Sequence, residues 1–143
     1  MGAAAMTQIW PALIAAIAAW LFGAVYYGLL GKTWVAAQGQ TMEGLKAQNA
    51  GKSALSNALP FILSFIALFV MAMAIAGILF HTGYFSLRGG MMTGAMLWFG
   101  FVLTTIAVNN AFSSRRPMLT IIDAGHWLGA MLIIGAIIGW LNS

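Results

Sequence analysis

The sequence contains no cysteine and very little charge: two Asp and Glu side chains against six Lys and Arg side chains, with charged residues at 6% of 143. Without cysteine, thiol redox chemistry is excluded. A soluble domain carries about a quarter charged residues, so a soluble enzyme and a disordered chain are also excluded. Six basic side chains are too few to track a phosphate backbone, which excludes nucleic acid as a partner.

Apolar residues are abundant instead, at 62% of the chain. A helix that crosses a bilayer needs about 20 mostly apolar residues, and four stretches meet this requirement. The sequence therefore predicts an all-α integral membrane protein with four transmembrane helices in an up-down bundle. Residues 1–143 form a single transmembrane domain, since the loops leave no room for a soluble one. The predicted spans are 9–30, 55–80, 89–112 and 119–141.

The basic residues predict how the spans are oriented. Five of the six fall in the loops 31–54 and 113–118, and one falls in the loop between the second and third spans. Loops rich in Lys and Arg stay in the cytoplasm. Both of these loops are therefore predicted to be cytoplasmic and both termini periplasmic, in a bacterial inner membrane.

Polar residues inside the third and fourth spans form the candidate site. The loop that joins these spans has six residues, so the spans are antiparallel neighbours. Counted from that loop, their polar residues lie at matched depths, with two arginines just above them. The predicted cluster consists of Thr104, Thr105, Asn109, Asn110, Arg115, Arg116, Asp123 and His126.

Asp123 and His126 share one helix face, and two interpretations of them stay open. In the first, Asp123 is a structural lock that pairs with Arg115 or Arg116 and accepts a hydrogen bond from an asparagine of the third span. In the second, the imidazole handles protons near neutral pH and the carboxylate orients it. The lock is favoured, because a carboxylate so close to an arginine-bearing loop has a partner within reach.

Two further groups of residues are interpreted through packing and anchoring. The aromatic residues Tyr26, Tyr27 and Trp34 lie near predicted helix ends, where such rings anchor a span in the interface. Glycines at four-residue spacing allow helix backbones to approach closely, within one chain or between subunits, which favours a homo-oligomer. These glycines are Gly90, Gly94, Gly125, Gly129, Gly135 and Gly139.

Four motifs resemble those of the bacterial membrane family catalogued as domain of unknown function 1761. They are W-x-G-F-x-x-T-T at 98–105, R-P at 116–117, I-D-x-G-Y/H at 122–126, and an aromatic-rich exit followed by G-K-x-W at 31–34. The resemblance implies a four-helix inner-membrane protein and brings no established activity. The matching residues are Trp98, Gly100, Phe101, Thr104, Thr105, Arg116, Pro117, Ile122, Asp123, Gly125, His126, Gly31, Lys32 and Trp34.

Three classes of function remain, and the first is favoured. It is a non-enzymatic membrane component: a homo-oligomer, an assembly factor or a subunit of a membrane complex. The second is a small transporter or channel that uses Asp123 and His126 for proton or ligand handling. The third is a membrane-embedded enzyme, which one in-span acid and one in-span histidine make implausible, since they cannot build a two-metal or paired-carboxylate site. No cofactor and no metal are predicted.

Overall fold

A computed structural model of the chain describes the backbone of residues 2–143 and the side chains of residues 7–143. The described residues fold into helices. These residues contain no strand, and four of their helical segments are long and apolar enough to cross a membrane. The prediction of an all-α fold with four long apolar helices is confirmed. The elements are α1 (Gly2–Ala37), α2 (Met42–Ala50), α3 (Ala54–Thr82), α4 (Leu87–Leu97), the π-helix η1 (Trp98–Leu103), α5 (Thr104–Phe112) and α6 (Pro117–Leu141).

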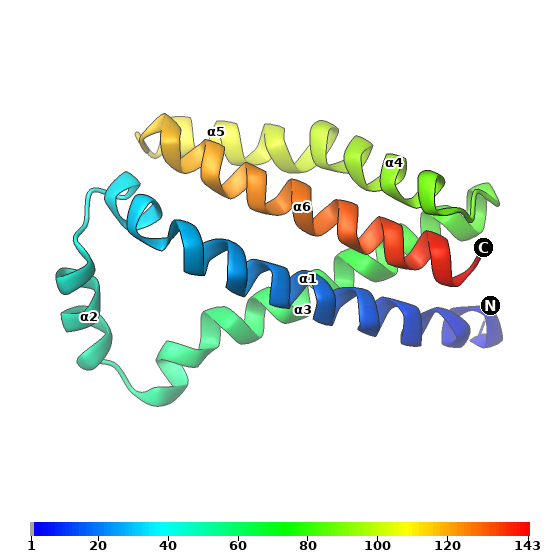
Figure 1. The fold of residues 1–143 in the computed structure, drawn as a ribbon, viewed down its shortest axis with the longest axis horizontal. Coiled ribbons are helices and arrows are strands. Elements are labelled where there is room, and N and C mark those ends of the chain that lie inside the picture. Colours follow the sequence, from blue (N-terminus) through cyan, green and yellow to red (C-terminus); the bar gives the residue numbers. More distant parts are fainter. Residues whose placement is uncertain (1) are drawn as a thin grey trace.

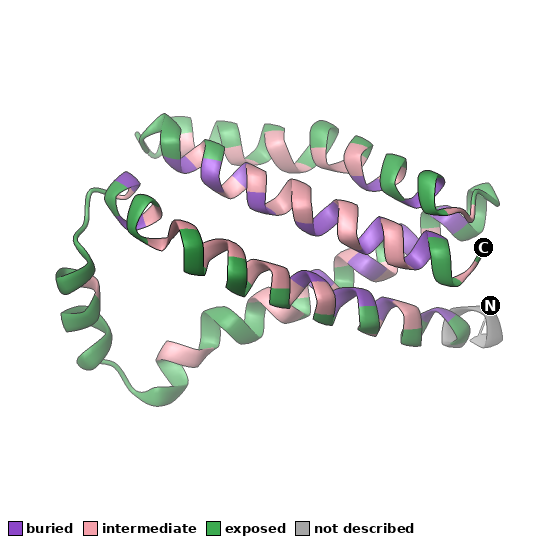
Figure 2. Cartoon of the chain, in the orientation of Figure 1, coloured by how far each residue is buried: buried purple, intermediate pink, exposed green. Residues whose placement is uncertain are grey.

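The last helix, α6, is the centre of the structure. It contacts α1, α3 and α4, and among the described residues it has more buried positions than any other helix, distributed along its length (Figure 2). The combined α4–η1–α5 rod packs mainly on α6, and its outer face is exposed. In Figure 1 both termini lie at one end of the molecule, and α2 and the turn between α5 and α6 lie at the other.

Helix α1 runs seven residues beyond the predicted end of its span, because its last two turns pack on α6. Val35 and Ala37 are buried there. The helix ends at Ala37, two residues before Gly39, whose φ of +76° is a left-handed conformation that glycine adopts without strain. The amide of Gln40 donates to the carbonyl of Val35, which is the bond expected after such a glycine stop.

Helices α1 and α3 touch along half of their length and then diverge. They pack through alanines and aliphatic residues at the end near the termini, where Ala15, Ala16, Ala72 and Ile75 are fully buried. Towards α2 the first half of α3 is mostly exposed and lies apart from α1 (Figures 1 and 2). This divergence leaves a space between the two helices, which α2 borders.

The helix-packing glycines lie at contacts within the chain. A Cβ atom added at Gly90, Gly94 or Gly135 would collide with the backbone of the opposing helix across the α4–α6 contact. Gly139 likewise faces the Ser86 carbonyl group. Gly125 and Gly129 serve the other side of α6, where they face side chains of α1. The backbones therefore touch directly, and these positions are used inside one chain.

Replacing Gly135 by Leu should separate α4 from α6, since the atoms it would meet are backbone atoms that cannot turn away. We expect a loss of about 2–4 kcal/mol in unfolding free energy, at the upper end of overpacking effects. Thermal unfolding in a mild detergent measures it. Gly77→Leu is the matched control, because a Cβ atom at Gly77 meets nothing within 4 Å. Equal melting of the two variants would contradict the packing described.

Candidate functional site

Asp123 is bound by two donors from α1. The hydroxyl group of Tyr27 donates to Asp123 Oδ1 at 2.7 Å, and the indole N–H of Trp34 donates to the same oxygen at 3.0 Å. Tyr27 and Trp34 are seven residues apart, two helical turns, and so lie on one face of α1. One carboxylate oxygen of α6 therefore joins two turns of α1. We call Asp123, Tyr27 and Trp34 the carboxylate clamp.

The turn of α6 that carries Asp123 accepts hydrogen bonds from both sides. On one side, the Tyr26 hydroxyl group donates to the Ile122 carbonyl oxygen at 2.8 Å. On the other, the indole N–H of Trp98 donates to the Ala124 carbonyl oxygen at 2.8 Å. A Cβ atom added at Gly125 would lie 2.7 Å from Tyr26 Oη, so the missing side chain there makes room for the tyrosine. This segment is thus fixed between α1 and η1.

His126 lies one turn further along α6, in a cage of aromatic rings. It is 8% exposed, and its ring stacks on Phe22 with a centroid distance of 6.0 Å and an interplanar angle of 8°. The rings of Tyr27 and Trp127 lie 4.9 and 5.0 Å away. Among the described residues, neither ring nitrogen has a hydrogen-bond partner, and Nδ1 is fully buried. The imidazole therefore keeps an unused donor and an unused acceptor.

The expected pairing of Asp123 with the loop arginines is wrong. Arg116 Nη1 donates to the Ala36 carbonyl oxygen at 2.8 Å and so caps the C-terminal end of α1. The side chain of Arg115 is exposed and has no hydrogen bond with any described residue. Seven residues separate Arg116 from Asp123, about 10 Å along the helix axis. The Tyr27 and Trp34 side chains of α1 reach the Asp123 carboxylate at this distance from the loop, whereas the two arginines do not.

The polar residues of the third and fourth spans were expected to contact one another, and one hydrogen bond joins them. Asn110 Nδ2 donates to Thr120 Oγ1 at 2.9 Å. Thr104 instead donates back to carbonyl groups of its own helix, whereas Thr105 and Asn109 are exposed. The cause is η1: a π-helix has more residues per turn, so α5 presents different faces than an uninterrupted α-helix would.

Tyr26, Tyr27 and Trp34 are the functional residues that sequence reasoning missed, since they were interpreted as interfacial anchors. They bind α6 instead. The spacing of Tyr27 and Trp34 on one helix face was a signal that could have identified them. Combined with a single acid within the predicted spans, two donors on one helix face indicate a shared acceptor.

A pocket of about 730 Å³ opens beside His126, in the space where α1 and α3 diverge. Its walls come from α1, α3 and α6, and α2 contributes Met42 and Leu45. His126, Tyr27 and Trp34 line it, whereas Asp123 does not. The carboxylate is thus held behind the aromatic wall, and the imidazole forms part of that wall.

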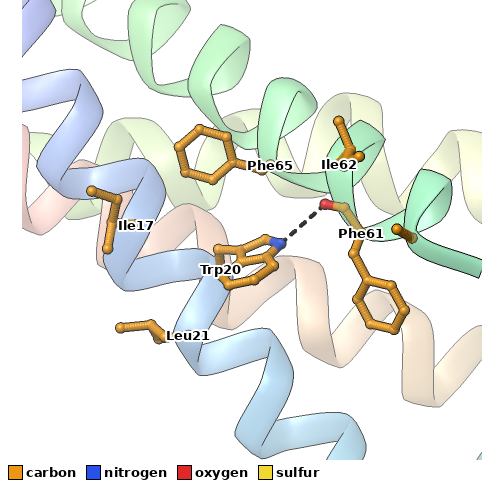
Figure 3. A pocket seen from close by; sticks show the side chains of 7 residues that line it. Ile17, Trp20, Leu21, Phe61, Ile62 and Phe65 are labelled. Carbon is orange, nitrogen blue, oxygen red and sulfur yellow. Dashed lines mark hydrogen bonds between the residues drawn. The ribbon is translucent and has the colours of Figure 1, made fainter. Parts of the chain in front are cut away.

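A second, shallower pocket of about 530 Å³ lies on the outer side of the α1–α3 crossing. Figure 3 shows it lined by apolar side chains around Trp20, whose indole N–H donates to the Phe61 carbonyl oxygen at 3.1 Å. That hydrogen bond holds α3 to α1 at the start of their divergence. Trp20 and Phe61 line both pockets, so they form the partition between them.

Comparison with known proteins gives one family. The sequence model described as "Protein of unknown function (DUF1761)" matches residues 10–139, nearly the whole chain. No curated protein and no solved structure matches the chain. Two of the motifs that carried the resemblance meet in the structure, since residues 26–34 bind residues 122–123. The chain belongs to the family of proteins of unknown function DUF1761.

Proposed function

We propose that this chain is a non-enzymatic integral membrane component, oligomeric or accessory to a larger complex, in which Asp123 is structural. The observation that carries the proposal is that Asp123 Oδ1 accepts from both Tyr27 and Trp34. A carboxylate that couples protons to cargo must exchange them with water. Asp123 lies outside the pocket lining, and its donors hold it against α1. Its role is to fasten α1 to α6.

The proposal includes an orientation. Loops 31–54 and 113–118 are cytoplasmic and both termini are periplasmic, in an up-down bundle that forms a single transmembrane domain in a bacterial inner membrane. Five of the six basic residues lie in those two loops, which supports this arrangement. The side of the bundle with α2 would then face the cytoplasm.

Reporter fusions test the orientation. A periplasm-dependent reporter fused after Ser143 should be active, and the same reporter inserted after Gln48 should be inactive, because positive loops resist export. A reporter after Ser143 that works only in the cytoplasm would contradict the proposed orientation.

The oligomeric part of the proposal concerns the exposed outer face of α4–η1–α5. Thr105 and Asn109 lie there one turn apart, and polar side chains on a lipid-facing helix promote association with another helix. A second copy of the chain or another membrane subunit would supply that helix. The packing glycines do not support association, since they are used within the chain. Mass measurement in nanodiscs decides between a monomer and an oligomer.

A second function, a small transporter or channel using Asp123 and His126, has one observation in its favour. His126 lines the larger pocket and has no hydrogen-bond partner among the described residues. Under this alternative, Asp123→Asn would leave stability near normal and abolish a pH-dependent activity, since an amide cannot carry the proton. Under the structural proposal, Asp123→Asn has no activity to abolish.

The carboxylate clamp predicts a specific pattern of stability changes. Asp123→Ala strands the Tyr27 hydroxyl group and the Trp34 N–H, and we expect it to cost about 2–4 kcal/mol. Tyr27→Phe and Trp34→Phe each remove one bond, worth about 0.6–1.7 kcal/mol within a membrane. Combining either with Asp123→Ala should cost less than the sum, because the bond is already lost. Unfolding in detergent or bicelles measures all of these values.

Arg115→Gln is the matched control, because the Arg115 side chain has no hydrogen bond to any residue that the structure describes. It should change stability by less than about 0.5 kcal/mol and add independently to Asp123→Ala. If Asp123→Ala melts like the parent, or couples to Arg115 and not to Tyr27, the structural role proposed for Asp123 is wrong.

A further inference from the structure

The pocket beside His126 has the dimensions of a ligand site. Its volume of about 730 Å³ lies within the range of small-molecule sites, about 300–1,000 Å³. Glycine makes part of its wall: a Cβ atom added at Gly28 or Gly31 would meet nothing within 4 Å. The backbone of α1 is therefore open to whatever occupies the pocket.

Among the described side chains that line the pocket, the imidazole of His126 and the indole N–H of Trp127 have no hydrogen-bond partner. Trp20 donates to Phe61 and Ser64, and Tyr27 and Trp34 donate to Asp123. His126 has no hydrogen-bond partner among the described residues, and its Nε2 lies at the wall, 2.8 Å from a Cβ atom added at Gly23. A buried polar group without a partner costs about 1–3 kcal/mol. A ligand with one donor or acceptor group would remove that cost.

The charge around the pocket selects a neutral ligand. None of the described residues that line it is Lys, Arg, Asp or Glu. An anionic head would lose its hydration without gaining a basic partner, and the Asp123 carboxylate lies one turn from His126. Fatty acids and phosphate esters are therefore disfavoured beside the imidazole.

The shape and the access select a flat, lipid-soluble ligand. Five aromatic side chains line the pocket, and rings favour stacked or edge-on contact with another flat ring. The pocket opens between α1 and α3, where its lining includes the exposed apolar side chains of Ala24, Pro60 and Phe61. A ligand would enter from the bilayer and leave its apolar tail between these helices. The five aromatic residues are Trp20, Tyr27, Trp34, Phe61 and Trp127.

We propose that this pocket binds a lipid-soluble molecule with a neutral, flat ring that bears carbonyl or hydroxyl groups, the chemistry of a membrane quinone. One ring oxygen hydrogen-bonds to His126, the ring lies among the aromatic side chains, and the tail follows the divergence of α1 and α3. The inference goes beyond the proposed function, and its test leaves Asp123 unchanged.

Binding of decylubiquinone to the full chain in nanodiscs tests this inference through tryptophan fluorescence, because Trp20, Trp34 and Trp127 line the pocket. The parent chain should show saturable quenching. Gly28→Leu fills the pocket from an open position and should weaken binding at least tenfold. Gly77→Leu, equally open and outside the pocket, should bind like the parent. His126→Phe keeps a ring in the cage and should weaken binding about fivefold, the worth of one hydrogen bond.

If Gly28→Leu unfolds at a lower temperature than the parent chain, Gly31→Leu replaces it as the pocket-filling variant. Palmitate serves as the anionic probe and should leave the decylubiquinone titration unchanged. Three results would overturn the inference: quenching that rises linearly without saturation, pocket-filling variants that melt and bind like the parent, or palmitate competing as strongly as the quinone. All binding is measured with Asp123 intact, so failure of the carboxylate clamp and failure of this inference are distinguishable.

Discussion

The hydrogen bonds from Tyr27 and Trp34 to Asp123 fix where α1 lies on α6, and the other parts of the site follow from that placement. In a bilayer the unpaired polar groups of a span have no water to bind, so each donor must find an acceptor inside the protein. Two donors from α1 converge on one oxygen of α6. That contact brings the Tyr27 ring against the His126 ring, at a centroid distance of 4.9 Å.

Small and large residues on facing helices make that contact possible. Gly125 leaves room for the Tyr26 hydroxyl group, and Gly129 leaves room for the Phe22 ring. On its other side α6 meets α4 backbone to backbone, at positions such as Gly135. The glycines of α6 thus serve two kinds of contact. Some make room for aromatic side chains of α1, and others allow the backbone of α4 to touch the backbone of α6. Van der Waals packing of this kind replaces the hydrophobic driving force that lipid removes.

Hydropathy predicted the four long helices, because a span must be apolar over a length set by the bilayer. It placed the end of the first helix at residue 30, since Lys32 interrupts the run, whereas a left-handed Gly39 ends the helix later. Asp123 and His126 were identified from their rarity within spans. Their partners on α1 were not, because pairing two distant helices requires knowledge of their relative rotation.

The π-helix shows why that rotation is hidden from the sequence. Counting depth from the connecting loop placed Thr105 and Asn109 level with the polar residues of the fourth span, but depth does not give the helix face. The π-helix η1 shifts the faces of α5, and both side chains are exposed. The same η1 directs the Trp98 indole to the Ala124 carbonyl oxygen, next to the carboxylate clamp. The segment around Asp123 is therefore held from α1 and from η1 together. With α6 fastened on both sides, the divergence of α3 from α1 leaves the pocket that His126 lines.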